Sequence, residues 1–483
     1  MAIEWSGLSP DFLVRLDRSG GQPLRAQLEA SLRDAIRGGR LRAGERLPSS
    51  RELARALGVS RGLVQECYAQ LLAEGYLTSH TGSATRVASI GGQSAGDRPG
   101  SGPSPPPGGA RSAGSPRLIA DFQPGLPDLS SFPRTDWAWA VKQACVQVAS
   151  ADLGYGDPRG SAMLREVLAG YLRRVRAADA SPDQMIISSG FAQGINVVLR
   201  ALARLGEVTQ VAFEDPGYGT VAEDETLRSV VGMGLGVVYV PIDEQGLVVS
   251  ELAASGAQAV VVTPAHQAPT GVVLSPARRH ALTSWARRGG GYVIEDDYDS
   301  EFRYDSEPVG TLQGLAPEQV FLLGTTSKAL APAVRLGWVH APARLAAAVA
   351  AEKEMNDRGS SMLDQLALAT MLTSGRYDRH LRRMRTVYAT RRTALTGAFA
   401  RHAPGVQLAG LAAGFQAVAP LPPGADEAAV ITAARARRVG LYGIREYLGH
   451  PERPAPPALV MGFGNVGERA IDPAIAAVAG LLS

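Results

Sequence analysis

Residues 324–337 of this chain read Gly-Thr-Thr-Ser-Lys-Ala-Leu-Ala-Pro-Ala-Val-Arg-Leu-Gly, and they hold one of only three lysines in a sequence with 46 arginines. An arginine stays protonated near neutral pH, whereas a lysine amine can lose its proton and form a Schiff base. Small hydroxyl residues precede Lys328, and Arg335 follows it. This arrangement suits an aldehyde that carries a phosphate group. The alternative is a solvated loop lysine, the reading that we favour for Lys142 and Lys353 in their polar, helix-like surroundings.

A second motif, about thirty residues upstream, points to the same chemistry. Residues 295–304 read Glu-Asp-Asp-Tyr-Asp-Ser-Glu-Phe-Arg-Tyr and follow an apolar run. A carboxylate at the carboxyl end of a strand points into the ligand crevice of an open α/β sheet, where it can keep a pyridine nitrogen protonated. A tyrosine two residues later can bind a phenolate oxygen. Taken alone the motif is better explained as a solvated acidic loop, but together with Lys328 it favours pyridoxal phosphate.

Three further turns follow apolar runs. Residues 188–194, Ser-Ser-Gly-Phe-Ala-Gln-Gly, open a helical stretch, so their backbone N–H groups can cradle a phosphate. The other two turns are residues 214–218 and 263–271. Tyr218 can stack on a pyridine ring, although a packed surface tyrosine is the commoner case.

The C-terminal three quarters of the chain alternate short apolar runs with helical patterns. Buried strands are predicted at residues 185–188, 211–213, 237–240, 259–262, 292–295 and 320–323. Helical stretches such as 163–176 and 276–288 lie between some of them. This order predicts an α/β domain with a mostly parallel sheet. From about residue 385 onward, after a long arginine-rich helix, we expect a smaller α+β part.

A segment rich in glycine, proline and serine divides the chain. Residues 89–116 contain almost no apolar side chains, so they cannot bury a core and predict a flexible linker. We therefore expect one domain over residues 21–88 and a second over residues 117–483.

The first domain has the pattern of a helix-turn-helix. Residues 22–37 have helical periodicity, Ser49 or Ser50 can cap a second helix, and Ser60 can cap a third over residues 61–74. Residues 75–87 predict a following hairpin. Ten arginines against six acidic residues give residues 21–88 a net charge of +4, compared with +3 for the whole chain. This basic excess points weakly to nucleic acid, and a generic helical hairpin is the alternative.

The bulk composition excludes several classes of protein. The chain is 45% hydrophobic and 20% charged, as in globular proteins. No apolar run approaches the roughly 20 residues that span a bilayer. Two cysteines make no disulfide framework, and no signal peptide is visible, so we expect a cytoplasmic protein without a membrane segment.

Residues 21–88 resemble the winged-helix domain of the GntR family. The resemblance implies double-stranded operator DNA as a partner, contacted by Arg51 of the Ser-Arg-Glu-Leu motif and by Arg61 and Gln65 at the start of the recognition helix. It places the wing tip, Thr81 and Gly82, in the minor groove. Arg and Gln side chains can reach base edges in the major groove.

Residues from about 118 to 483 resemble fold-type-I aminotransferases. The motifs occur in the order phosphate turn, Asp-Pro-Gly-Tyr, His-Gln-x-Pro-Thr-Gly, Asp-x-Tyr, Ser-Lys and Arg. Fused behind a GntR-like domain, they make the whole chain resemble the MocR subfamily of bacterial transcription regulators. The resemblance implies pyridoxal phosphate held as an internal aldimine on Lys328, with Asp296 at the pyridine nitrogen and Tyr298 at the phenolate oxygen.

The same resemblance implies a phosphate site and a dimer. The phosphate would be held by the amides of Phe191 and Ala192 and by Thr325, Ser327 and Arg335. The subfamily forms head-to-tail homodimers, in which Tyr155 would reach the phosphate of the other subunit's cofactor.

The sequence departs from the family patterns in four places. Aminotransferases of this fold place an arginine near the C-terminus to hold the substrate α-carboxylate, but residues 458–465 contain none. Some relatives that sense amino acids carry an arginine just after the Asp-Pro-Gly-Tyr tyrosine, where this chain has Gly219 and Thr220. Ala268 replaces an asparagine beside the phenolate oxygen, with Gln267 as a candidate substitute. Gly62 and Leu63 stand where the recognition helix often has hydroxyl residues.

These departures favour a transcription regulator that senses pyridoxal phosphate or an amino-acid-like effector over an enzyme that turns over amino acids. Control of vitamin B6 or amino-acid metabolism is the expected role. An active aminotransferase with an accessory DNA-binding domain is the first alternative. The second is a regulator whose large domain is a cofactor-free dimerisation scaffold.

Overall fold

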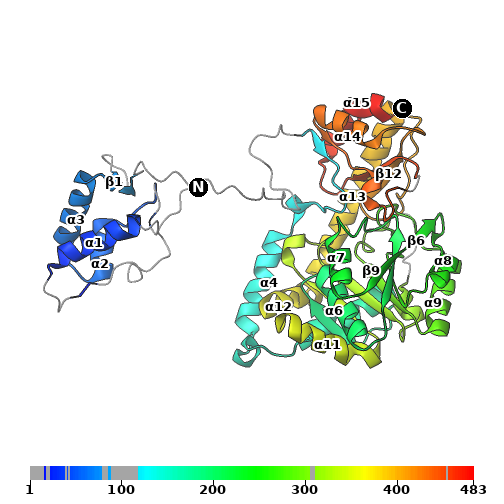
Figure 1. Ribbon diagram of the computed structural model, residues 1–483, viewed down its shortest axis with the longest axis horizontal. Coiled ribbons are helices and arrows are strands. Elements are labelled where there is room, and N and C mark those ends of the chain that lie inside the picture. Colours follow the sequence, from blue (N-terminus) through cyan, green and yellow to red (C-terminus); the bar gives the residue numbers. More distant parts are fainter. Residues whose placement is uncertain are drawn as a thin grey trace. The chain divides into compact units, whose positions relative to one another are not determined.

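The computed structural model describes residues 16–17, 22–37, 41, 44–78, 85–88, 118–304, 310–452 and 455–482. The chain divides into two compact units, Met1–Arg111 and Ser112–Ser483 (Figure 1). The predicted linker, residues 89–116, and the predicted wing-tip residues Thr81 and Gly82 lie outside the described residues.

The described residues of the N-terminal unit form three helices and a short antiparallel strand pair. Ser49 caps the second helix in a capping box with Glu52, and Ser60 caps the third, so both predicted caps are present. Gly58 ends the second helix with a φ of 62°. The elements are α1 (Leu24–Arg37), α2 (Ser50–Leu57), α3 (Arg61–Ala73), β1 (Leu77–Thr78) and β2 (Arg86–Val87). This is the helix-turn-helix with a following hairpin that the sequence predicts.

An eight-stranded mixed sheet forms the centre of the C-terminal unit, in the order β4-β11-β10-β9-β8-β5-β6-β7. The neighbours from β10 to β6 pair in parallel, whereas β11 is antiparallel to both of its neighbours and β7 is antiparallel to β6. The strands are β4 (Met185–Ser188), β5 (Gln210–Asp215), β6 (Gly236–Asp243), β7 (Gly246–Leu247), β8 (Ala259–Val262), β9 (Tyr292–Asp297), β10 (Val320–Thr325) and β11 (Gly337–His340). All six predicted strands are present, and the prediction of a mostly parallel sheet is confirmed.

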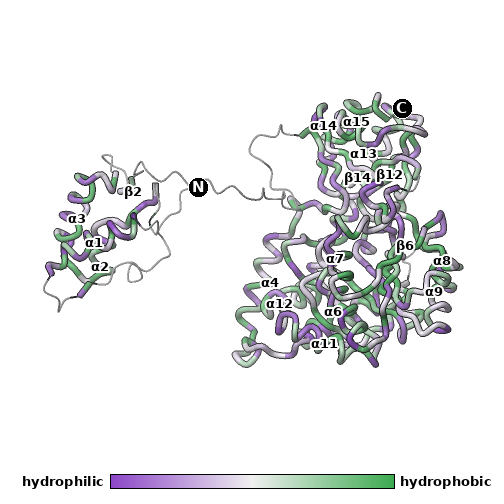
Figure 2. The backbone as a smooth tube through the Cα atoms, in the orientation of Figure 1, coloured by the Kyte–Doolittle hydropathy of each residue, from purple (hydrophilic) through white to green (hydrophobic). Residues whose placement is uncertain are grey.

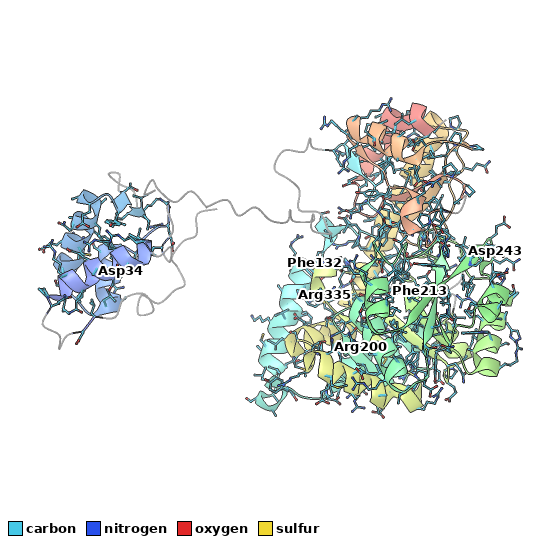
Figure 3. All side chains as sticks on the ribbon, in the orientation of Figure 1. Asp34, Phe132, Arg200, Phe213, Asp243 and Arg335 are labelled. Carbon is cyan, nitrogen blue, oxygen red and sulfur yellow. The ribbon has the colours of Figure 1, made fainter. Side chains whose placement is uncertain are left out.

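Helices cover both faces of this sheet, and alternate strand residues face opposite layers. Phe213, Val261 and Ile294 pack with α6, α7 and α11, whereas Val260 and Val293 pack with α8 and α9 on the other face (Figures 1 and 2). Phe213 is fully buried, while Arg200 on the outer side of α6 is exposed (Figure 3). The helices are α4 (Arg134–Gln147), α5 (Ala162–Arg176), α6 (Phe191–Arg204), α7 (Glu225–Gly232), α8 (Val249–Ala254), α9 (Pro276–Gly289), α10 (Leu312–Leu315), α11 (Ala343–Asp357) and α12 (Met362–Thr373).

The long arginine-rich helix α13 (Arg376–His402) leads from the sheet layer into a smaller α+β part (Figure 1). There β12 (Gln416–Pro420) pairs antiparallel with β14 (Ala458–Gly462), and α14 (Glu427–Ala436) and α15 (Glu468–Leu482) lie alongside. The strand β13 (Val439–Gly440) pairs with β3 (Ala120–Asp121), so the start of the C-terminal unit joins its end. Short 3₁₀ turns occupy Leu129–Ser131, Ser150–Leu153, Pro182–Gln184, Pro332–Val334 and Ile444–Tyr447.

Among the described residues, no helix is long and apolar enough to cross a membrane.

Candidate functional site

The predicted site residues lie at the carboxyl ends of neighbouring parallel strands. The strands β10, β9, β8 and β5 are adjacent in the sheet, so the turns that leave them meet at one edge. Lys328 follows β10, Asp296 lies at the end of β9, and Tyr218 follows β5. The fold therefore places three motifs that are up to 110 residues apart in sequence at one edge of the sheet.

Asp296 is buried at this edge of the sheet, and Lys328 is half-buried there. Burial lowers the pKa of the Lys328 amine, although the negative charges of Asp296 and Asp299 oppose this shift. The amine donates a hydrogen bond of 2.6 Å to the carbonyl oxygen of Gly125. A lysine with a lowered pKa is a better nucleophile toward an aldehyde at neutral pH.

Asp296 has an unused acceptor. Its side chain is buried, and its Oδ1 has no hydrogen-bond partner among the described residues. Its Oδ2 accepts a hydrogen bond of 3.4 Å from the Tyr218 hydroxyl. Burial raises the pKa of Asp296 well above its usual range. A buried carboxylate oxygen without a partner is costly, and a protonated pyridine nitrogen would satisfy it.

The residues predicted to bind phosphate lie close together at the start of α6. Gly190, with a φ of 112°, is the N-cap of α6. Because glycine has no side chain, it makes no capping hydrogen bond to the backbone N–H groups of the first turn. A Cβ atom built on Gly190 would lie 3.5 Å from Arg335 Nη1 and 3.9 Å from Thr325 Oγ1. The Thr325 hydroxyl in turn donates to Ser327 Oγ at 2.9 Å. A helix N-terminus, two hydroxyls and a guanidinium suit a phosphate dianion.

Tyr218 packs beside this phosphate end. Its ring stacks on that of Phe191, with the centroids 6.3 Å apart and an interplanar angle of 22°. Burial, together with the charge of Asp296, raises the pKa of the Tyr218 phenol well above 10. The predicted stacking tyrosine is therefore fixed between the phosphate turn and the buried carboxylate.

Tyr298 lies in a hydrogen-bonded cluster that the sequence did not identify as a unit. Its hydroxyl donates to the carbonyl oxygen of His266 at 2.9 Å, and the His266 Nδ1 lies 2.7 Å from Asp299 Oδ2. Burial lowers the pKa of His266, but the Asp299 carboxylate more than offsets this, so the pKa is raised. His266 belongs to the turn 263–271 and Asp299 to the motif 295–304, but their ion pair is revealed only by the fold.

Tyr155 stands apart from these residues. It is 79% exposed, and its ring lies 5.9 Å from the Arg358 guanidinium.

The N-terminal unit exposes the side chains predicted to contact DNA. Arg51 lies in the first turn of α2, and Arg61 and Gln65 lie in the first half of α3, all of them exposed. The opposite side of α3 carries Val64 and Cys67 into the core. The recognition helix thus presents one polar face that can enter a major groove.

Both units match known families. Residues 24–87 match the bacterial regulatory proteins of the gntR family, and residues 126–446 match the aminotransferases of class I and II. These matches lie inside the predicted domains, whose exact boundaries stay a prediction. A probable rhizopine catabolism regulatory protein, MocR of Rhizobium meliloti, is 32% identical over 94% of this chain and 92% of its own length.

The chain is a MocR-type regulator of the GntR family. The pyridoxine biosynthesis transcriptional regulator PdxR of Corynebacterium glutamicum is also similar, at 31% identity over 95% of this chain and 96% of that protein. An archaeal alanine:glyoxylate aminotransferase shares the fold, with a TM-score of 0.67 and 24% identity over 76% of this chain and 91% of that one. Membership of the class I and II aminotransferase family supports pyridoxal phosphate as the cofactor.

Both stretches that lack an expected arginine are tightly packed in this MocR-type regulator. A Cβ atom on Gly219, whose φ is 77°, would lie 2.5 Å from the carbonyl oxygen of Glu446. In the stretch 458–465, Val460 is fully buried and a Cβ on Gly462 would lie 2.1 Å from the carbonyl oxygen of Gln123. Backbone atoms thus occupy the space that larger side chains would need at these two glycines.

Gln267 is engaged elsewhere in the regulator. Its Nε2 donates to the carbonyl oxygen of Pro216 at 2.8 Å, and its Oε1 accepts from the Thr270 hydroxyl at 2.6 Å. The side chain is 1% exposed. It therefore ties two strand-end turns together, and the suggestion that it replaces the missing asparagine gains no support.

Proposed function

We propose that this MocR-type regulator binds pyridoxal phosphate at Lys328 and alters its DNA binding in response to the cofactor or to an amino-acid-like effector. The observation that carries the proposal is the combination of the half-buried Lys328, with its lowered pKa, and the buried Asp296, with its unused Oδ1. When bound, pyridoxal phosphate would supply an aldehyde for the lysine and an electron-poor ring. Asp296 would then hold the proton on the ring nitrogen.

The remaining site residues would fix the cofactor's orientation. The first turn of α6, Thr325, Ser327 and Arg335 would bind its phosphate, and Tyr298 would approach its phenolate oxygen. Similarity to a regulator named for pyridoxine biosynthesis makes vitamin B6 metabolism the favoured target of control.

The absence of arginine at Gly219 and in residues 458–465 supports sensing over turnover. A bidentate arginine gives a carboxylate charge-assisted hydrogen bonds, and this chain has no arginine in residues 458–465 and no space for a larger side chain at Gly219. Steady transamination of common amino acids by the purified protein would instead favour the alternative of an active aminotransferase.

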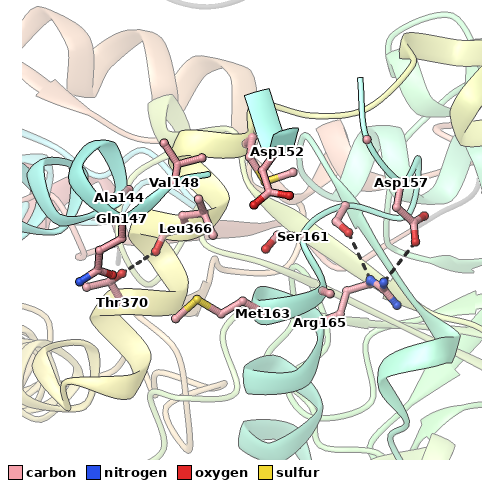
Figure 4. Close-up of a pocket in the computed structure, with 14 residues that line it drawn as sticks. Ala144, Gln147, Val148, Asp152, Asp157, Ser161, Met163, Arg165, Leu366 and Thr370 are labelled. Atoms are coloured by element: carbon pink, nitrogen blue, oxygen red, sulfur yellow. Dashed lines mark hydrogen bonds and ion pairs between the residues drawn. The ribbon is translucent and has the colours of Figure 1, made fainter. Parts of the chain in front are cut away.

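We further propose a homodimer whose subunits complete each other's sites. Val146, Leu153, Tyr155 and Met163 are between 42% and 79% exposed, which is unusual for large apolar side chains. Met163 also lines a hollow of about 460 Å³ between α4, α5 and α12, and the other three residues are neighbours in sequence of residues that line it (Figure 4). A second copy covering this face would bring Tyr155 toward the other subunit's phosphate end.

The direct test of the cofactor site is visible absorption. A pyridoxal aldehyde acquires a visible band when it condenses with a lysine amine, so the purified protein should be yellow and a Lys328→Ala variant colourless. Retention of the band by the variant would place the cofactor on another amine. A protein that stays colourless with added pyridoxal phosphate would favour the cofactor-free scaffold.

A further inference from the structure

Lys353 is buried, and the solvated position that the sequence favoured for it is wrong. Its side chain is 0% exposed within α11. The Nζ donates to both carboxylate oxygens of Asp357 one helical turn later, at 2.6 and 2.8 Å. A buried ammonium group is costly unless it is paired, so the pair with Asp357 is what makes this position tenable.

The Lys353–Asp357 pair is connected to the phosphate turn. Asp357 Oδ2 accepts a hydrogen bond of 2.7 Å from Gln193 Nε2, and Asn356 Oδ1 accepts a second one of 2.6 Å. At the other end of the same amide, Gln193 Oε1 accepts from the backbone N–H of Ser189 at 2.8 Å and from its hydroxyl at 3.1 Å. Each end of the Gln193 amide is thus held in one orientation.

Ser189 and Gln193 flank the groups proposed to bind phosphate. Ser189 immediately precedes Gly190, and Gln193 is the third residue of α6, after Phe191 and Ala192. The Gln193 side chain accepts the hydrogen bond of the Ser189 N–H and so holds the backbone that leads into α6. Gly190 leaves the N–H groups of the first helical turn without a side-chain cap. The geometry of the turn therefore depends on a network that begins at Lys353, 160 residues away.

We propose that Lys353 is a positioning residue for the phosphate group of the cofactor, acting through Asp357 and Gln193 on the turn at the start of α6. The inference rests on the proposed function, because it assumes that this turn holds the phosphate of pyridoxal phosphate. Lysine suits the position because its unbranched stem and compact ammonium can be buried, whereas a guanidinium is larger and presents five N–H groups that need partners.

Comparison of pyridoxal phosphate with pyridoxal isolates this role, because the two aldehydes differ only in the phosphate. We expect Lys353→Met to weaken binding of pyridoxal phosphate by about tenfold. Loss of a residue that orients a ligand-binding group, without touching the ligand, lowers the affinity of metal sites by about the same factor. Binding of pyridoxal should change by less than about twofold. Methionine keeps the unbranched stem and removes the buried charge, so the fold should persist. Both affinities are read from the visible absorption in titrations of the full-length protein.

Three further measurements make the test decisive. Gln193→Leu should show the same selective loss, and the double variant should lose no more than Gln193→Leu alone because both residues act in one network. If Lys353→Met does not fold, Gln193→Leu decides the question by itself. Lys142→Met, which removes an exposed lysine, should leave both affinities unchanged.

Equal weakening of pyridoxal phosphate and pyridoxal, or no weakening of either, would overturn the inference. If wild-type protein develops no visible band with either aldehyde, the cofactor site itself is wrong, and that outcome is distinct from the failure of Lys353.

Discussion

The amine of Lys328 donates a 2.6 Å hydrogen bond to the carbonyl oxygen of Gly125, which lies 203 residues earlier in the chain. Gly125 follows β3, and β3 pairs with β13 of the smaller C-terminal part. The proposed cofactor anchor is thus in direct contact with a segment tied to that part. A lysine nitrogen that has condensed with an aldehyde has fewer hydrogens to donate, so cofactor binding should weaken this contact. A ligand can shift a conformational equilibrium only through such a difference between states.

Replacement of Asp296 by Asn should weaken the binding of pyridoxal phosphate. Asn fits the same space but cannot balance the charge of a protonated ring nitrogen, and a hydrogen bond to a charged group contributes about 1.5–3 kcal/mol. We expect a loss of about tenfold to a hundredfold in affinity, measured by titration of the visible band. Undiminished affinity in the variant would remove Asp296 from the site.

Gly219→Ala should destabilise the C-terminal unit. The new Cβ would lie 2.5 Å from the Glu446 carbonyl oxygen, at a φ of 77° that L-residues rarely adopt. We expect a loss of about 1–3 kcal/mol in the free energy of unfolding, measured by urea denaturation. Gly467→Ala is the matched control, because no atom lies within 4 Å of its added Cβ. A loss of equal size in both variants would show that position 219 is not specifically closed.

Stability of the cofactor-free protein should fall as pH rises from about 5 to 8. Burial raises the pKa of Glu214, Glu295 and Glu301 to about 7. Because these folded-state values exceed the unfolded ones, the protonated groups favour the folded state, and this contribution is lost as pH rises through 7. The free energy of unfolding of Glu214→Gln, relative to that of wild type, should therefore increase by about 2 kcal/mol from pH 5 to pH 8. Parallel stability profiles for the two proteins would contradict the raised pKa of Glu214.

Arg61→Ala should weaken specific DNA binding and relax the sequence preference. Arg61 is exposed at the start of α3, where a guanidinium can bind a guanine edge, and such contacts contribute about 1–3 kcal/mol. Gln70→Ala on the same helix is the control, because Gln70 donates to Glu74 instead. Binding to a preferred and to an unrelated fragment, at the same salt concentration, separates the effects. A loss of equal size on both fragments would assign Arg61 to the phosphate backbone alone.

Most of the sheet and the grouping of the site could be predicted because both depend on local patterns. Six apolar runs match β4, β5, β6, β8, β9 and β10, and motifs at their carboxyl ends meet because parallel strands end together. The antiparallel β11 and the two-residue β7 were not predicted. β11, Gly-Trp-Val-His, is short and carries a glycine and a histidine, so it gives a weak strand pattern.

Contacts between distant side chains could not be read from the sequence. Burial of Lys353 depends on how α11 packs against α6 and β4, and the pairing of His266 with Asp299 depends on the meeting of two strand-end turns. The closure of Gly219 requires the Glu446 backbone from the smaller C-terminal part. In each case the sequence supplied the residue type, while the partner came from the tertiary fold.

The central claim is that the cofactor site at Lys328 controls DNA binding. The most direct test measures the affinity of wild type and Lys328→Ala for a promoter fragment selected from genomic DNA, with and without pyridoxal phosphate at one salt concentration. We expect the cofactor to change the wild-type affinity by at least about fivefold, the lower end of typical coupling between sites, and to leave the variant unaffected. An unchanged wild-type affinity, or an equal response in the variant, would contradict the account.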